Sequence, residues 1–368
     1  MFLTAYNLPH YLMTKGLASA DSIVDGDFML AEAGRRNRNF KIFRRKQGGL
    51  FVKQIKTADA QAITTIQREA AFYRTVHSDA KYGALSRMMP RFFDYEGSRH
   101  ALTLSLTENA ESLSEHQMRQ GEMPENTARL IGNALGIAHA HGATVAADPA
   151  MRSLFPYQLP WPMMMEQTGI AFLNGFGTTG PQIVQAMQQM PTLQTMLSGL
   201  RQFWQYDSLI HGDMKWDNCL ISQPAGATEP QLTIVDWELA DIGDGAWDVA
   251  TIFKEYLVAA ILSFNARQNA AAQNLPAPPD QSIARSQPSI RAFWKAYMQG
   301  RGLSGAQAAA CLDRAVRYTA ARMIIAVLEY LGASSQFSPL GDTMLETARG
   351  ILESPQAAAA QMIGVPAT

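Results

Sequence analysis

Two stretches, Leu209–Leu220 (LIHGDMKWDNCL) and Leu232–Ala250 (LTIVDWELADIGDGAWDVA), decide how this chain is interpreted. In the second stretch, Asp236 comes directly after an apolar run. The polar positions of the first stretch are His211, Asp213 and Asn218. An aspartate in an exposed loop is ordinary by itself. Two aspartates and an asparagine in this order, with strand-like flanks, indicate a functional site.

The residue types suit phosphoryl transfer from Mg-ATP. That reaction needs a carboxylate beside the attacking hydroxyl, oxygen ligands for magnesium and cations on the phosphates. Asp213 is the candidate catalytic carboxylate, which would orient the hydroxyl and accept its proton. Asn218 and Asp236 are the candidate Mg²⁺ ligands. His211 is interpreted as a buried residue that braces the loop rather than as a proton carrier.

The first stretch resembles the catalytic loop of the kinase superfamily, H-R-D-L-x-x-x-N in protein kinases. Gly212 after the histidine, VDWE in place of D-F-G, and GDGAWDVA with Asp248 resemble the aminoglycoside phosphotransferase and choline kinase family. The resemblance implies an α+β, bilobal protein-kinase-like fold. Its N-lobe would hold an antiparallel sheet and one helix, and its C-lobe would be mostly helical. We expect a nucleotide-binding N-lobe at 1–108 and a C-lobe at 109–368 with the catalytic loop and acceptor site.

The resemblance assigns roles to further residues. Lys53, in the strand LFVKQ, matches the kinase lysine that meets the α- and β-phosphates, and Glu69 matches the helix glutamate that holds this lysine. The alternatives are an exposed lysine at a strand end and a boundary residue of the helix. Lys215 corresponds to a lysine that contacts the γ-phosphate in protein kinases, or faces solvent. Asp248 resembles the aspartate that braces the loop. Glu238 is a candidate second metal ligand, or a residue that supports a metal ligand.

A basic segment precedes Lys53. From Gly34 to Lys56 there are nine Lys or Arg and no acid. Backbone N–H groups of the turn AGRRNRNF and the nearby cations suit polyanions, so Gly34 and Asn37 are candidate nucleotide contacts. The alternative is a solvated basic edge. The turn carries less glycine than the family's nucleotide loop, which is a departure from the pattern.

Hydrophobic periodicity and turn residues place the remaining elements. A helix at 60–77, capped by Asp59, should carry Glu69 at the edge of its apolar stripe. Strands are expected on both sides of turns at Gly34–Asn39 and Gln47–Gly49 and at 91–96 and 100–111. Other helices are expected at 8–19, 125–141, 182–204, 288–299 and 306–333. A flexible loop is expected at 267–282 and a fraying tail at 355–368.

Composition excludes several classes of protein. The formal net charge is −1, so the chain as a whole does not attract nucleic acid or an anionic membrane. Two cysteines cannot build a disulfide framework, which favours a reducing, cytoplasmic location. The N-terminus does not resemble a signal peptide, and no run reaches the ~20 apolar residues of a membrane span. No protein partner is implied.

The acceptor is less constrained. The absence of an A-P-E sequence after Asp236 argues against a regulated protein kinase. Glu238, Asp241, Asp244 and Glu255 would suit a polycationic acceptor, but residues 281–322 hold seven Lys or Arg and one acid. That balance favours a neutral or anionic acceptor, or a peptide.

Three hypotheses follow. The leading one is an ATP-dependent kinase of a small-molecule alcohol such as an antibiotic, a sugar or an amino alcohol. The alternative is a kinase of Ser or Thr in a peptide, because the basic N-terminal segment with HGDMKWDNCL also resembles phosphotransferases of peptide natural-product pathways. The third, a non-catalytic nucleotide-binding relative, is disfavoured by the intact set of candidate site residues.

Overall fold

The computed structural model describes residues 2–34, 37–175, 180–223, 226–227, 229–278, 280–331 and 339–366. Within it the chain forms two compact units. The first unit comprises Met1–Ser112, Pro149–Phe155 and Asn218–Ala240. The second unit comprises Leu113–Asp148, Pro156–Asp217 and Asp241–Thr368. The assignment of nucleotide binding to 1–108 and of the acceptor site to 109–368 stays a prediction.

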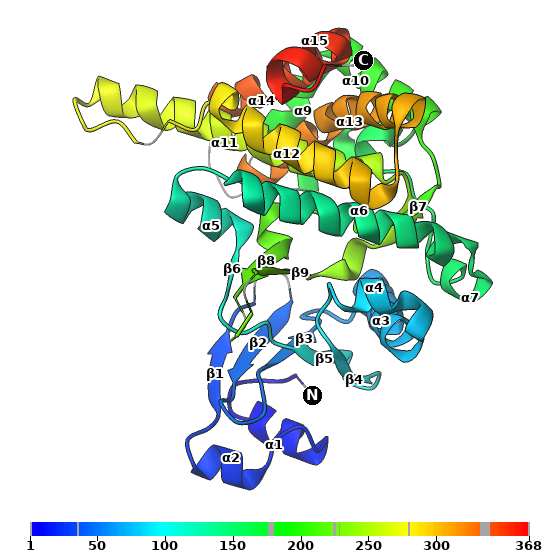
Figure 1. The fold of residues 1–368 in the computed structure, drawn as a ribbon, viewed down its shortest axis with the longest axis vertical. Helices are drawn as coiled ribbons and strands as arrows, with labels where there is room; N and C mark the ends of the chain where they lie inside the picture. The colour runs from blue at the N-terminus through cyan, green and yellow to red at the C-terminus, as the bar shows by residue number, and fades with distance from the viewer. Residues whose placement is uncertain are drawn as a thin grey trace. The chain divides into compact units, whose positions relative to one another are not determined.

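The first unit is built on a five-stranded antiparallel sheet in the order β1-β2-β3-β5-β4 (Figure 1). Its strands are β1 (Met29–Glu32), β2 (Arg38–Phe43), β3 (Leu50–Gln54), β4 (Phe92–Glu96) and β5 (Ala101–Ser105). Gly48, with φ of +71°, makes the predicted tight turn between β2 and β3. Because β3 lies in the centre of the sheet, its side chains are held from both sides.

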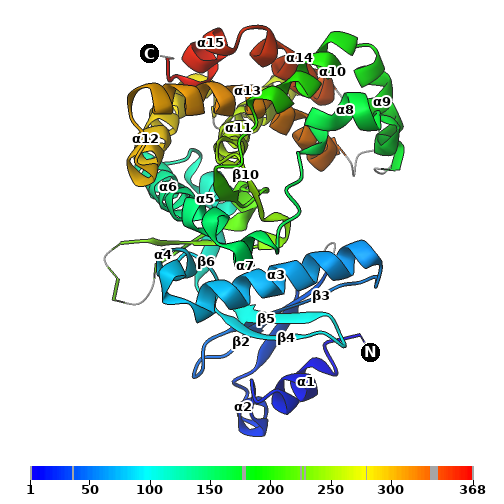
Figure 2. The same cartoon turned by 90° about the vertical axis from the view of Figure 1, so that its right-hand side faces the viewer.

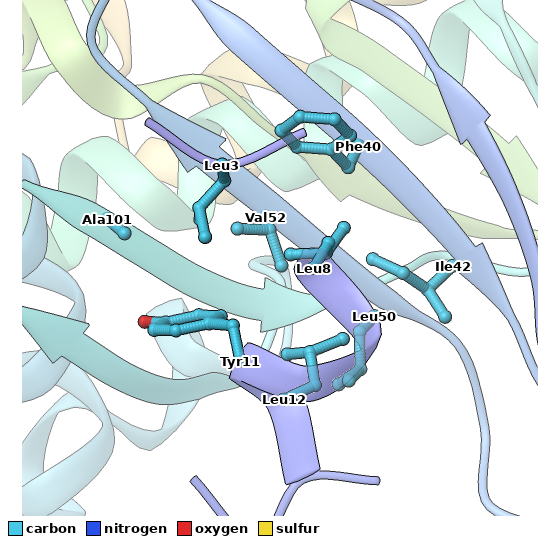
Figure 3. Close-up of a cluster of buried hydrophobic side chains, with 9 residues drawn as sticks. All are labelled: Leu3, Leu8, Tyr11, Leu12, Phe40, Ile42, Leu50, Val52 and Ala101. Atoms are coloured by element: carbon cyan, nitrogen blue, oxygen red, sulfur yellow. The ribbon is translucent and has the colours of Figure 1, made fainter. Parts of the chain in front are cut away.

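The pleat of β3 sends alternate side chains to opposite faces of the sheet. Leu50 and Val52 lie in an apolar cluster beneath the N-terminal helix α1 (Leu8–Thr14), which Figure 3 shows against the sheet. The members of that cluster are Leu3, Leu8, Tyr11, Leu12, Phe40, Ile42, Leu50, Val52 and Ala101. Lys53 points to the other face, where helix α3 (Ala60–Ser78) lies (Figure 2).

Three shorter strands complete the first unit: β6 (Ala110–Ser112), β8 (Cys219–Ser222) and β9 (Gln231–Ile234), in the order β6-β8-β9. The register pairs Cys219 with Ile234. The small helices of this unit are α2 (Ala20–Val24), η1 (Ala80–Tyr82), α4 (Gly83–Ser86), α7 (Pro149–Arg152) and η6 (Trp237–Leu239). The hairpin of β8 and β9 brings two distant parts of the sequence to one end of a ladder.

The second unit is mostly helical. Its longer helices are α5 (Leu113–Gln120), α6 (Glu125–Ala147), α9 (Gly180–Gln188), α10 (Pro191–Gly199), α11 (Ala246–Ala272), α12 (Ile283–Arg301), α13 (Gly305–Leu331) and α14 (Pro339–Glu353). Its shorter elements are η2 (Trp161–Met164), α8 (Met165–Thr168), η3 (Ala171–Gly175), η4 (Leu200–Phe203), β7 (Ser208–Ile210), β10 (Asp241–Gly243), α15 (Pro355–Ala358) and η7 (Ala359–Ile363). The antiparallel pair β7 and β10 leads into the catalytic-loop sequence. The 3-10 helix η5 (Trp216–Asn218) follows that loop.

Helices α6 and α12 approach each other closely because glycines line their contact. A Cβ atom on Gly132 would lie 2.2 Å from the carbonyl oxygen of Phe293, and one on Gly136 would lie 2.5 Å from that of Tyr297. From the other side, a Cβ on Gly300 would lie 2.9 Å from the carbonyl oxygen of Asn133. A side chain at any of these positions would push the two backbones apart.

Helix α11 is long and apolar enough, by length and composition, to cross a membrane. However, 61% of its most apolar window is buried inside the protein. Trp247, Val249, Ile252 and Phe253 are each at most 2% exposed. This burial is typical of the central helix of a globular core. No apolar run of this length was expected from the sequence, so the length of the apolar segment in α11 was underestimated.

Some predicted boundaries were wrong. The single helix expected at 182–204 is divided between α9 and α10, where Pro191 begins a new helix. The loop expected from Arg267 begins only after Ala272, because the alanine-rich segment continues α11. The tail forms α15 and η7, with Ala358, Ala359 and Ile363 buried, rather than fraying. The expected end of a helix at residues 332–333 lies outside the described residues.

Candidate active site

Lys53 is the centre of a buried ionic cluster in the first unit. The Lys53 side chain is 4% exposed, and its Nζ lies 3.0 Å from Oε2 of Glu69, 2.5 Å from Oδ1 of Asp236 and 2.8 Å from Oε2 of Glu238. Strand β3 supplies the lysine, and α3, which begins at the predicted Asp59 cap, supplies Glu69. The predicted pairing of Lys53 with Glu69 is therefore present in the structure.

Three carboxylates compete for this one ammonium group. Burial alone would lower the pKa of Lys53, but Glu69, Asp236 and Glu238 outweigh it, and the pKa lies well above its ordinary value. Burial raises the pKa of Glu69 to about 7, because Lys53 only partly offsets the lost hydration and the neighbouring carboxylates. The cluster carries excess negative charge that a further cation would relieve.

Asp236 has the left-handed backbone conformation, with φ of +66° and ψ of 54°. This conformation is uncommon for a residue with a side chain and is frequent at functional sites. Asp236 lies two residues after the end of β9, and the backbone N–H of the intervening Val235 donates to the carbonyl oxygen of Asn218 at 2.9 Å. Asn218 and Asp236, the two predicted metal ligands, thus lie at the same end of the β8–β9 ladder despite the long hairpin between them.

A metal ion would find suitable ligands in this cluster. One carboxylate oxygen from each of Glu69, Asp236 and Glu238 lies within 4.8 Å of the others. Glu69 is buried with Lys53, whereas the side chains of Asp236 and Glu238 are 42% and 16% exposed. Carboxylate oxygens are the ligands that Mg²⁺ prefers, so the donor set fits this ion.

The catalytic-loop sequence lies in the second unit up to Asp217. Oδ2 of Asp213 is 2.8 Å from Nζ of Lys215, and its Oδ1 is 3.2 Å from Nη2 of Arg322. Burial alone would raise the pKa of Asp213, but Arg322 and Lys215 outweigh it and hold the pKa far below its usual range. Asp213 is therefore an anion at any physiological pH.

Asp248, at the start of α11, fixes the backbone of this loop. Its carboxylate is fully buried and accepts hydrogen bonds from the N–H groups of His211 at 2.7 Å and Gly212 at 3.0 Å. Trp247 donates its indole N–H to the carbonyl oxygen of Gly212 at 3.3 Å. Nδ1 of His211 in turn accepts the N–H of Asp213 at 3.2 Å. These contacts match the bracing roles predicted for His211 and Asp248.

The same carboxylate begins a buried chain of polar groups. Nε2 of His139 lies 3.2 Å from Oδ2 of Asp248, and Nδ1 of His139 lies 3.0 Å from the hydroxyl of Tyr297. Burial lowers the pKa of His139, so the ring is neutral, donates from Nε2 to Asp248 and accepts the Tyr297 proton at Nδ1. Arg301 then donates to the Tyr297 oxygen at 2.7 Å and pairs with Asp207 at 2.8 Å. Helices α6, α11 and α12 are joined in this way.

The sequence of the chain was compared with those of known protein families. A model of the "Phosphotransferase enzyme family" matches residues 27–281, more than half of the 368-residue chain. The chain belongs to the phosphotransferase enzyme family. The predicted family is confirmed, and with it the prediction that the protein is a kinase. A search of curated proteins found no significant sequence match.

Solved structures show the same fold as this phosphotransferase. Plasmodium vivax ethanolamine kinase has a TM-score of 0.60 at 14% identity, over 96% of this chain and 91% of that one. A choline kinase from Cryptosporidium parvum has a TM-score of 0.58 at 10% identity, covering 96% and 97%. The GDP complex of an aminoglycoside 2'-phosphotransferase-IIIa mutant has a TM-score of 0.51 at 14% identity, covering 96% and 99%. The predicted α+β, protein-kinase-like fold is confirmed.

The predicted phosphate turn is only partly described. A Cβ on Gly34 would lie 2.5 Å from the carbonyl oxygen of Asn37, so this tight turn requires glycine. Nδ2 of Asn37 donates to Oε2 of Glu238 at 3.4 Å, which ties the turn to the Lys53 cluster. Residues 35–36 lie outside the described part of the phosphotransferase. Nucleotide contacts by Gly34 and Asn37 stay a prediction.

Sequence reasoning missed Arg322. The arginine stands in an apolar stretch of α13, YTAARMIIAV, where helical periodicity predicts a core face. A charged residue within such a face indicated that it must have a buried partner. It did not indicate which residue that partner is.

The balance of charged residues at 281–322 is not a reliable guide to the charge of the acceptor. Of the seven cations in residues 281–322, three are buried in ion pairs: Arg301 with Asp207, Arg314 with Asp244 and Arg322 with Asp213. Asp241 is also occupied, because it accepts the N–H groups of Tyr157 and Gln158. The number of Lys and Arg residues in 281–322 therefore does not measure the charge available to an acceptor. The same holds for the carboxylates of Asp241 and Asp244.

Proposed function

We propose that this kinase transfers the γ-phosphate of ATP to a hydroxyl group of a small molecule that also carries an amine. Lys53 would hold the α- and β-phosphates, and Lys215 would contact the γ-phosphate. Asn218 and Asp236, supported by Glu238, would hold Mg²⁺, which when bound neutralises charge on the phosphates. The Lys53 cluster is the observation that carries nucleotide binding, because its excess carboxylates leave room for one more cation.

Asp213 would orient the acceptor hydroxyl. A carboxylate with so low a pKa is a weak base, and an efficient general base has a pKa near the working pH. Phosphoryl transfer passes through a loose transition state in which positioning matters more than early proton removal. The half-buried and doubly paired Asp213 suits that positioning task.

A group of acidic residues in the second unit supports an amine on the acceptor. Nζ of Lys254, which is fully buried, lies 2.6 Å from Oε1 of Glu255 and 3.4 Å from Oε2 of Glu329. Burial raises the pKa of Tyr330, and the charges of Glu255, Glu329 and Asp217 raise it further, so all three carboxylates lie near this phenol. Three carboxylates against one ammonium leave a net negative charge, and Asp217 is four residues after Asp213.

A second candidate is a kinase of Ser or Thr in a peptide. An open groove of about 550 Å³ lies between α6 and α12. Arg129, Arg291 and Lys295 line it with a single acid, Glu125. A surface of this kind would suit an acidic peptide segment.

A panel of acceptors separates the two candidates. The purified protein is incubated with Mg-ATP and amino alcohols, aminoglycosides, neutral sugars or acidic Ser/Thr peptides, and phosphorylated products are identified by mass. Our proposal expects products from amine-bearing alcohols and none when Asp213 is replaced by Ala. Transfer to neutral sugars alone would contradict the proposal that the acceptor carries an amine. Transfer to peptides alone, lost in an Arg291→Glu and Lys295→Glu double variant, would establish the second candidate.

A further inference from the structure

Arg322 is a buried cation whose position in the fold needs an explanation. Its residue is 2% exposed, within the core-facing side of α13. Burying a guanidinium is costly unless its charge and its N–H groups are matched. Its partners are Oδ1 of Asp213 at 3.2 Å, the carbonyl oxygen of Gly212 at 3.3 Å and the ring face of Trp247 at 5.2 Å. Two of these three partners belong to the catalytic loop.

The two oxygens of Asp213 are held in different ways. Oδ1 is bound to Arg322, whose side chain is 3% exposed and fixed by the loop carbonyl and Trp247. Oδ2 is bound to Lys215, whose side chain is 32% exposed. A lysine on a flexible stem can exchange partners, whereas a planar guanidinium bound at two points cannot do so without leaving both. Of these two contacts, the one made by Lys215 is therefore the easier to exchange.

We propose that Arg322 is a positioning residue for phosphoryl transfer, and that its contacts with Oδ1 and the loop carbonyl hold Asp213 in the orientation that receives the acceptor hydroxyl. This inference rests on the proposed function of Asp213. Lys215 would turn to the γ-phosphate as the carboxylate receives the acceptor hydroxyl. Arg322 meanwhile keeps Oδ1 and the loop backbone in place.

The charges around Asp213 support this role of Arg322. Arg322 on α13 and Lys215 and His211 on its own loop all favour its ionised form. Asp248 on α11 carries a negative charge near the loop, but its carboxylate accepts hydrogen bonds from the N–H groups of His211 and Gly212. With Lys215 on the phosphate, the buried guanidinium of Arg322 would still favour the ionised form of Asp213.

Variants at one position separate positioning from simple support of the fold. Arg322→Gln removes the charge, and Arg322→Lys keeps a charge but replaces the planar two-point contact by a single ammonium group on a flexible stem. Arg317→Gln is the matched control, because Arg317 lies on the same helix and pairs with Asp313, away from the loop. Turnover of Mg-ATP, with water or with an identified alcohol as acceptor, is measured from pH 5 to pH 8.

We expect kcat to fall ~10²-fold in Arg322→Gln with little change in the KM for ATP, as for a misplaced reacting group. Its activity should also be lost at the acid end of the range, because the pKa of Asp213 rises when the guanidinium is gone. Arg322→Lys should restore activity at acid pH but recover kcat only in part. A role in folding alone would lower the thermal unfolding temperature without moving the acid limb.

The outcomes distinguish the inference from the function on which it rests. If Arg322→Lys kept both the kcat and the acid limb of the wild type while Asp213→Asn lost turnover, Arg322 would not position the carboxylate. This test holds even where the glutamine variant does not fold. If Asp213→Asn kept the wild-type kcat, or the wild type did not turn over Mg-ATP, the proposed function itself would be wrong.

Discussion

At the scale of single residues, buried charges are each matched by a small number of contacts. Lys53 is matched by three carboxylates, and Asp213 by one buried cation, Arg322, and one more exposed cation, Lys215. The first arrangement leaves excess negative charge for a further cation, and the second keeps the Asp213 carboxylate ionised. In both arrangements, removing charged groups from water costs free energy. The loss of any one partner would therefore destabilise the arrangement strongly.

Replacing Lys53 by Met should lower kcat/KM for ATP by ~10²–10³-fold, because a preorganised cation on the phosphates is lost. Steady-state turnover at varied ATP concentration measures the effect. Lys46→Met is the matched control, since Lys46 lies nearby in sequence and its side chain is 72% exposed. Equal losses in both variants would mean that only the general basic charge of this segment matters.

Replacing Asp248 by Asn should lower the free energy of unfolding by about 3 kcal/mol. An amide cannot accept from His211, Gly212 and His139 together, so buried N–H groups lose their partner. Chemical denaturation measures the change. Asp313→Asn, which breaks a partly exposed pair with Arg317, should cost at most about 1 kcal/mol. A cost for Asp248→Asn no greater than that of the control would show that the loop is not braced there.

At the scale of elements, the path of the chain decides which residues meet. Strand β3 and helix α3 were predictable, because alternation and an Asp59 cap are local signals, and their meeting brings Lys53 to Glu69. The contact of Arg322 with Asp213 was not predictable, because 109 positions separate them and periodicity does not say which helix a side chain meets. The division of the helix at Pro191 was readable from the proline and was overlooked.

The contact of α6 with α12 should not tolerate a methyl group at Gly132. Gly132→Ala should destabilise the protein by about 1–3 kcal/mol, because the new Cβ would meet the backbone oxygen of Phe293. Gly350→Ala in α14 is the matched control, since nothing lies within 4 Å of its Cβ position. It should instead stabilise the helix by about 0.5–1 kcal/mol. Thermal unfolding of the two variants should shift in opposite directions, and shifts of the same sign would contradict the close packing.

At the scale of the whole molecule, each unit has its own core and its own share of the chemistry. The first unit carries the Lys53 cluster and the β8–β9 ladder, and the second carries the loop with Asp213. Residues before 27 lie outside the family match, yet Leu3, Leu8 and Leu12 fill the core beneath the sheet. The N-terminal segment is thus an integral part of the unit that holds Lys53.

Leu12→Ala should therefore cost about 2–4 kcal/mol in the free energy of unfolding, as for other fully buried leucines. Tyr6→Ala is the control, because Tyr6 is 96% exposed and should have almost no effect. Denaturation monitored with and without Mg-ATP measures both. If Leu12→Ala left stability unchanged, the N-terminal helix would not belong to the folded unit.

The central claim is that Mg²⁺ and ATP bind together at the Lys53 cluster. Titration of a non-hydrolysable ATP analogue into the purified protein, with and without Mg²⁺, tests it most directly because no acceptor is needed. We expect binding that requires Mg²⁺ in the wild type, persists in Asp213→Asn and is lost in Asp236→Asn. Binding of equal strength without Mg²⁺, or unchanged binding in Asp236→Asn, would contradict the account.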